Sequence, residues 1–217
     1  MSDTLKTFWS FRLNEVKRVL EENNFDVYLA DTALEAKKIV ENNIIPALAP
    51  RRISWGGSVT FTDTGLYDAL KNNAQFEILD TFSKKGTPEE SLELRRQALL
   101  VDLFITGTNA VTETGKLVNL DMIGNRVGAI TFGPKNVIIL AGRNKLVNDV
   151  EEAINRVKLV AAPANTIRLK KKNPCLKTGY CEECSSKERI CNAWTIHEKS
   201  FPKGRIKVVL INEDLGI

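Results

Sequence analysis

The sequence has no long apolar run, and no segment approaches the roughly 20 consecutive apolar residues of a membrane-spanning helix. Its first ten residues lack the apolar stretch of a signal peptide and are expected to begin a helix. The 31 basic and 27 acidic residues are interspersed and leave a net charge of only +4, which gives no indication of nucleic-acid binding. These absences predict a cytoplasmic protein without a membrane or nucleic-acid partner.

The sequence motifs of several large enzyme classes are also missing. The chain contains no Gly-x-Ser-x-Gly, no P-loop and no Gly-x-Gly-x-x-Gly. A serine hydrolase, an NTPase and a Rossmann dehydrogenase therefore have no support. His197 is the only histidine, and no acid or nucleophile partner for it is visible in the sequence.

Helix-like and strand-like patterns alternate along the chain. Amphipathic spacing predicts a helix over Thr4–Asn23, and apolar runs predict strands over 103–106, 137–141 and 206–211. A further strand is expected over Val127–Phe132. Strands that alternate with helices of about 10–15 residues indicate βαβ units. We therefore predict an α/β fold with a largely parallel sheet flanked by helices and a cysteine-rich loop near the C-terminus.

The composition changes near Pro163, after which the chain becomes basic and contains all its cysteines. We expect residues 1–161 and 205–217 to form the α/β domain. Residues 162–204 are then a cysteine-rich, metal-binding insertion looped out of that domain.

The four cysteines lie within 17 consecutive residues, as Cys175-x5-Cys181-x2-Cys184-x6-Cys191. A Cys-x-x-Cys pair presents two thiolates to one metal, and two further cysteines complete an S4 set. Zinc sites often use two such pairs and only one is present, whereas iron–sulfur clusters accept irregular spacing, so the pattern favours [4Fe–4S] over zinc. Structural thiols or a disulfide pair are the alternatives.

A Gly-rich turn follows the short apolar segment Arg52–Trp55. Gly56 and Gly57 would let the backbone approach a ligand, while Ser58 and Thr60 supply hydroxyl groups. Such a loop suits a small anion, and the alternative is a plain strand-to-helix turn.

A second polar loop follows the apolar strand predicted at 103–106. Its candidate ligand-binding residues are Gly107, Thr108, Asn109 and Thr112, and Glu113 is its candidate catalytic carboxylate. In open α/β sheets, ligands bind at the carboxyl ends of the strands, where this loop would lie. Ser58, Thr60 and Glu113 are predicted to line one pocket, and a solvated polar loop is the alternative.

The chain resembles the lactate-utilisation (LUD) domain family. The resemblance is carried by Ser54-Trp-Gly-Gly-Ser-Val-Thr60 and by Asp102-Leu-Phe-Ile-Thr-Gly-Thr-Asn-Ala-Val-Thr-Glu-Thr-Gly115, and it continues through Leu117-Val-Asn-Leu120 and Ile130-Thr-Phe-Gly-Pro-Lys135. It implies a fold similar to that of the ribose-5-phosphate isomerase and coenzyme A transferase superfamily. It also implies a place beside the machinery that oxidises L-lactate to pyruvate, with other redox subunits of that machinery as partners.

The resemblance leaves the reaction, and whether the protein is an enzyme, open. Coenzyme A transferase relatives use a loop glutamate as nucleophile, and Glu113 lies in a comparable loop. The larger iron–sulfur subunit of lactate utilisation resembles the same domain followed by ferredoxin-type cysteine motifs, which this chain lacks. Three functions follow: a redox-associated protein that binds a small anion and a metal centre, a transferase- or isomerase-like enzyme using Glu113, and a non-enzymatic sensor with structural zinc. A homo-oligomer is compatible with each.

Overall fold

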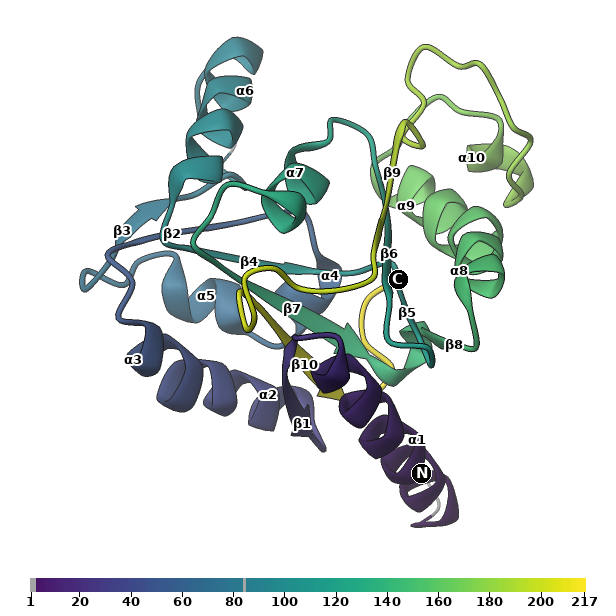
Figure 1. Ribbon diagram of the computed structural model, residues 1–217. Coiled ribbons are helices and arrows are strands. Elements are labelled where there is room, and N and C mark those ends of the chain that lie inside the picture. The colour runs from purple at the N-terminus through teal and green to yellow at the C-terminus, as the bar shows by residue number, and fades with distance from the viewer. Residues whose placement is uncertain (1–2, 84) are drawn as a thin grey trace.

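A six-stranded parallel sheet forms the centre of the molecule (Figure 1). The computed structural model describes residues 3–83 and 85–217. The strand order is β1-β10-β7-β4-β2-β3, and every neighbouring pair is parallel. The strands are β1 (Asp26–Ala30), β2 (Arg52–Trp55), β3 (Glu77–Leu79), β4 (Leu103–Gly107), β7 (Asn136–Gly142) and β10 (Ile206–Ile211). This sheet confirms the predicted α/β fold.

Helices cover both faces of this sheet (Figure 1). Their bounds are α1 (Asp3–Glu22), α2 (Ala33–Ile39), α3 (Ile45–Leu48), α4 (Val59–Asp63), α5 (Leu66–Leu70), α6 (Pro88–Gln97), α7 (Asn125–Thr131), α8 (Val150–Arg156), α9 (Ala162–Arg168) and α10 (Cys175–Thr178). π-helical turns join α2 to α3 and α8 to α9, and single 3-10 turns follow α6 and β7.

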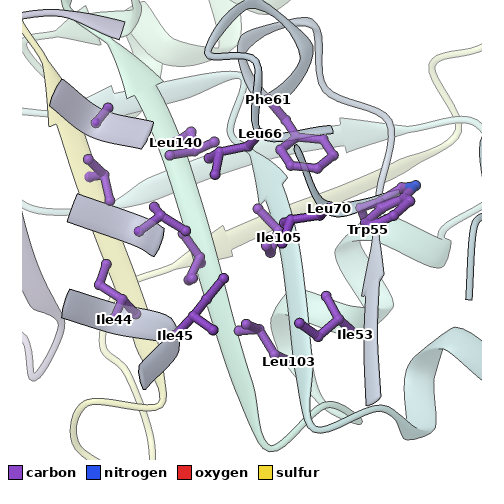
Figure 2. Close-up of a cluster of buried hydrophobic side chains, with 14 of the residues drawn as sticks. Ile44, Ile45, Ile53, Trp55, Phe61, Leu66, Leu70, Leu103, Ile105 and Leu140 are labelled. Carbon is purple, nitrogen blue, oxygen red and sulfur yellow. The ribbon is translucent and has the colours of Figure 1, made fainter. Parts of the chain in front are cut away.

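The buried core is divided by the sheet into two layers. On one face, side chains from α2 to α5 pack on alternate residues of the central strands, including Ile53, Ile105 and Leu140 (Figure 2). On the other face, α1 supplies Leu13 and Val16 to the intervening residues of β1, β7 and β10. Because β4, β7 and β10 are buried on both faces, they read as continuous apolar runs.

The segment predicted as a strand over Val127–Phe132 is mostly helical, and that prediction was wrong. The helix α7 begins because the Asp121 carboxylate accepts hydrogen bonds from the backbone N–H groups of Arg126 and Val127, at 3.1 Å each. These are two of the N–H groups that a helix start leaves without an internal partner. A contact from the preceding turn therefore overrides the strand propensity of the apolar residues.

A smaller mixed sheet lies beside the first, in the order β8-β5-β6-β9. Its strands are β5 (Ala110–Thr112), β6 (Leu117–Asp121), β8 (Leu146–Val147) and β9 (Ala193–His197). The strand β9 falls within residues 162–204 and pairs antiparallel with β6. The expected insertion is therefore tied to the rest of the molecule by a strand. Among the helices of the described residues, none is long and apolar enough to cross a membrane.

Candidate functional site

Four loops meet at the carboxyl edge of the parallel sheet. They follow β10, β7, β4 and β2, which are consecutive neighbours in the sheet, so the residues after each strand end lie side by side. The loops after β2 and β4 are the two that the sequence singled out. The loops after β7 and β10 are added by the structure. This is the edge where open α/β sheets bind their ligands.

The loop after β2 comes very close to the loop after β4. A Cβ atom on Gly107 would lie 2.5 Å from Ser58 Oγ, and one on Gly56 would lie 3.0 Å from the ring of Phe104. Both positions therefore exclude any larger residue. Ser58 accepts a hydrogen bond from the Phe61 N–H at 3.1 Å and caps the start of α4. Ser58 and the glycines thus have structural roles that bring the loops together, and of these only Gly57 is exposed.

Thr60 links three of the four loops. Its Oγ1 accepts a hydrogen bond from Lys145 Nζ at 2.7 Å and donates one to the Leu215 carbonyl at 3.3 Å. Lys145 ends the turn after β7, and its side chain is only 4% exposed. Burial lowers the pKa of Lys145 to about 7, and repulsion by Arg156 and Arg126 adds to the effect, while Asp63 opposes it.

Arg126 organises the loop after β4. Its guanidinium donates to Asn109 Oδ1 at 2.7 Å, to the Gly107 carbonyl at 3.1 Å and to Asn119 Oδ1 at 2.6 Å. It also forms a buried ion pair with Asp121 at 2.7 Å, so its charge is neutralised. Asn109 in turn accepts from the Leu120 N–H at 2.9 Å. Asn109 is therefore held rigidly by Arg126 and β6.

Arg156 approaches the same region from the end of α8. Its guanidinium donates to the backbone carbonyls of Asn109 at 2.7 Å and Asn144 at 3.0 Å. Burial lowers the pKa of Arg156. In the part of the chain that the structure describes, neither Arg156 nor Lys145 forms an ion pair with a carboxylate. The edge therefore carries two basic side chains that are not paired with a carboxylate of the described residues.

Two other predicted ligand residues are used within the protein. Thr108 is buried and donates to the carbonyls of Ala110 and Val118, at 3.1 Å and 3.3 Å. Thr112 is also buried, and its hydroxyl accepts from the Lys116 N–H at 2.9 Å across the turn between β5 and β6. Both hydroxyl groups stabilise backbone turns.

Glu113 lies apart from this arrangement, at the end of β5. Its carboxylate pairs with Arg12 of α1, whose Nε donates to it at 2.7 Å. The surface hollow that Glu113 lines is formed otherwise by α1 residues: Phe8, Phe11, Arg12, Glu15 and Val16. Ser58 and Thr60 are not among the residues that line this hollow, and a pocket shared by the three residues stays a prediction.

The cysteine loop forms a second candidate site. Cys175 lies at the start of α10, Cys181 and Cys184 lie in the following loop, and Cys191 precedes β9. All four line one small cavity, together with Ala162, Pro163, Asn173, Glu182, Glu183 and Arg189. Burial raises the pKa of the Cys191 thiol, and nearby Cys181 and Cys175 contribute to the effect.

Backbone and charge contacts hold this loop around the cavity. Arg189 donates to the carbonyls of Cys184 at 2.7 Å and Cys191 at 2.9 Å, while Lys158 pairs with Glu183 at 2.6 Å. In the structure as described for residues 3–83 and 85–217, no three His, Cys, Asp or Glu side chains form a group that could hold a metal ion. The four cysteines therefore surround a shared space without meeting at one point.

No functional role was predicted from the sequence for Lys145, Arg126 or Arg156. Lysine and arginine are usually exposed, and these three are recognised only when their neighbours are known. One signal was available for Lys145, because Gly142-Arg-Asn-Lys145 follows a buried strand in the same way as the two loops that were singled out. Arg126 lies directly before the segment that was wrongly predicted as a strand, so its place at the start of a helix was not expected.

The six-stranded parallel sheet with helices on both faces and a smaller mixed sheet beside it defines the class of the protein as α/β. The chain belongs to the LUD domain family, whose model matches residues 13–211. A crystal structure of a DUF162 family protein from Deinococcus radiodurans is similar, with a TM-score of 0.51 and 14% identity over 94% of this chain and 97% of that chain. At this identity the likeness shows the fold alone. No curated protein matches this chain.

Proposed function

We propose that this protein is a redox-associated member of the LUD family, in which the four cysteines bind a [4Fe–4S] cluster and the sheet edge binds a small anion. The observation that carries the proposal is the cavity that all four cysteines line together. A chance cluster of surface thiols would not surround one space. Redox subunits of lactate utilisation are the proposed partners, as the family resemblance implies.

The donor set fits a cluster better than a single ion. Zinc with four cysteine ligands holds each sulfur at about 2.3 Å, which brings all four sulfurs close to one point. In a cluster each cysteine binds a different iron, so the sulfurs stand further apart. The described residues contain no group of three ligands able to hold one ion, yet Cys175, Cys181, Cys184 and Cys191 share a cavity. The irregular spacing of the four cysteines, with a single Cys-x-x-Cys pair, favours the cluster, and structural zinc is the second candidate.

The surroundings of the cavity also suit a cluster. Four thiolates add negative charge, and Lys158 and Arg189 lie close enough to Cys191 to lower its pKa against the effect of burial. The Arg189 guanidinium fixes the backbone at two of the four cysteines. A cluster bound there would supply one-electron transfer, and the protein would supply the ligands and the charge balance.

The test is the iron and sulfide content of protein purified without oxygen. We expect close to four irons per chain and a brown protein, and Cys184→Ser should lose most of the iron because a hydroxyl is a poor ligand for iron in a cluster. The matched control is Ser185→Ala, which changes an exposed neighbour and should keep the iron. A colourless protein with one zinc per chain would contradict the cluster and support structural zinc in its place. Protein without metal, or with equal iron in both variants, would contradict the proposal.

A further inference from the structure

Lys145 is a buried amine at the carboxyl edge of the sheet. It is 4% exposed, and its single hydrogen bond in the described part of the chain goes to the Thr60 hydroxyl at 2.7 Å. A buried ammonium needs a counter-charge, since burial removes the hydration that stabilises it. Lys145 has no carboxylate within ion-pair distance among the described residues. The site is therefore electrostatically incomplete.

The charged groups that face Lys145 make this deficit larger. Arg156 of α8 and Arg126 of α7 both repel its charged form, and Asp63 at the end of α4 is the one group that favours it. The charge of Arg126 is already matched by Asp121. Two cations, Lys145 and Arg156, thus share one weak counter-charge, and an added anion would balance them.

Two buried hydrogen-bond donors near the loop after β4 have no partner among the residues that the structure describes. Thr106 Oγ1 and Asn119 Nδ2 are buried and have no hydrogen-bond partner in the described structure. Asn119 is bound to Arg126 through its other atom, and Thr106 is the residue before Gly107. Unsatisfied buried donors are rare in proteins and point to a missing acceptor. An oxyanion supplies several acceptors at once.

The segment after β10 covers Lys145. A Cβ atom on Gly216 would lie 2.5 Å from Thr60 Oγ1 and 3.3 Å from Lys145 Nζ, so the backbone of this segment lies directly over both. It is held by hydrogen bonds from Leu215 N to Asn144 at 3.1 Å and from Gly216 N to Asp63 at 3.1 Å. Asn144 Nδ2 also donates to the Gly216 carbonyl at 3.4 Å, and the Leu215 side chain packs partly buried against the core. A ligand that reaches Lys145 from this side has to displace these contacts.

We propose that Lys145 and Arg156 form an anion subsite that takes the carboxylate or phosphate group of a small ligand, which displaces Leu215–Gly216 as it enters. The inference rests on the anion-binding part of the proposed function and adds the cations and the chemical class of the ligand. Binding stabilises the protonated amine, so the protein takes up a proton with the anion wherever free Lys145 is neutral. Arg156 stays charged and aligns the oxygens.

Calorimetric titration at pH 8, in two buffers of different ionisation enthalpy, tests the subsite. Acetate represents a carboxylate, and sulfate represents a phosphate without titrating in this range. We expect one of the two anions to bind with uptake of close to one proton. Lys145→Met should weaken that binding by about tenfold or more and abolish the proton uptake. Lys38→Met, at an exposed lysine of α2, is the control and should behave as the parent.

Arg156→Gln is the second variant, in case Lys145→Met does not fold, and it should weaken the same anion by about tenfold or more while keeping the proton uptake. If the anion binds the parent, Lys145→Met and Arg156→Gln with equal affinity, the subsite is contradicted. Anion binding elsewhere at the sheet edge, as in the proposed function, would then remain supported. Binding of neither anion to the parent would overturn both. The iron content reports separately on the cysteine loop, so failure of the metal proposal is distinguishable.

Discussion

Among single residues, Lys145 connects the packing of the sheet edge to its chemistry. Its amine is buried between the loops after β2, β7 and β10, where Thr60 is its hydrogen-bond partner. The surrounding cations and the loss of water favour the neutral form, so the pKa falls to about 7. Near neutral pH this side chain can gain or lose its charge, which an exposed lysine cannot do.

The first prediction at this scale concerns stability and pH. In the unfolded chain Lys145 keeps its proton up to the ordinary lysine range, whereas the folded protein releases it near pH 7. Between these two values the unfolded state binds more protons, so the Lys145 contribution to the free energy of unfolding rises with pH. Lys145→Met should remove a rise on the order of 3 kcal/mol between pH 7 and pH 10. Urea denaturation of the parent and the variant at several pH values measures this rise. The same dependence of the free energy of unfolding on pH in both proteins would contradict the lowered pKa of Lys145.

Glu113 is expected to contribute to local stability through Arg12. Both side chains are about one-third exposed, at 37% and 33%, so water screens their interaction. Glu113→Gln should lower the free energy of unfolding by about 1 kcal/mol or less, and in the Arg12→Met background the same change should cost nothing further. A double-mutant cycle with urea measures this coupling. Loss of a coenzyme A transfer activity in Glu113→Gln would instead support the enzyme alternative.

At the scale of elements, α7 shows how a turn residue determines a helix. Asp121 lies at the end of β6, and its carboxylate binds both the first N–H groups of α7 and the guanidinium of Arg126. The two side chains are each only 9% exposed. This carboxylate therefore joins the smaller sheet, the helix and the loop of Asn109 into one unit.

Asp121→Asn should be strongly destabilising, because it leaves the Arg126 charge buried without a partner. The expected loss is about 3 kcal/mol in the free energy of unfolding. Asp149→Asn is the matched control, since Asp149 caps the start of α8 at the surface and asparagine caps as well as aspartate. Chemical denaturation of both variants at pH 7 gives the comparison. A loss below about 1 kcal/mol for Asp121→Asn would show that Arg126 finds another partner.

The helical run from α8 to α9 links the two candidate sites. Arg156 contacts the loop after β4, and Ala162, six residues later in the same run, lines the cysteine cavity. Cys191 also packs against the cluster of Leu120, Val157 and Ala162. The cysteine loop is thus packed against β6 and the helical run.

The sequence predicts the parallel sheet well, because burial on both faces makes β7 and β10 continuous apolar runs. It predicts α7 wrongly, because the capping carboxylate of Asp121 lies outside the apolar run. Two of the four edge loops were found from their glycines and hydroxyls. Lys145 was not found, since its burial depends on three loops that are distant in the sequence. The four cysteines that were predicted as ligands line one cavity, and their binding of a metal stays a prediction.

In the whole molecule, the α/β body carries two candidate sites of different chemistry, one at the carboxyl edge of the parallel sheet and one at the cysteine loop. The sheet edge presents cations and unsatisfied donors, which suit an anion. The loop that contains Cys175–Cys191 presents four thiols around one cavity, which suits a metal centre. A ligand at the first site and an electron carrier at the second would be joined by α8 and α9. This arrangement is what the proposed redox-associated function needs.

The measurement that tests the central claim most directly is X-ray absorption of the protein purified without oxygen. It reports the metal and its neighbours without relying on any activity. The account predicts an iron edge with sulfur neighbours and a second shell of iron atoms, which only a cluster produces. Loss of that second shell in Cys184→Ser would assign it to the cysteine loop. A zinc edge with four sulfurs would contradict the cluster, and metal bound without sulfur neighbours would contradict the site.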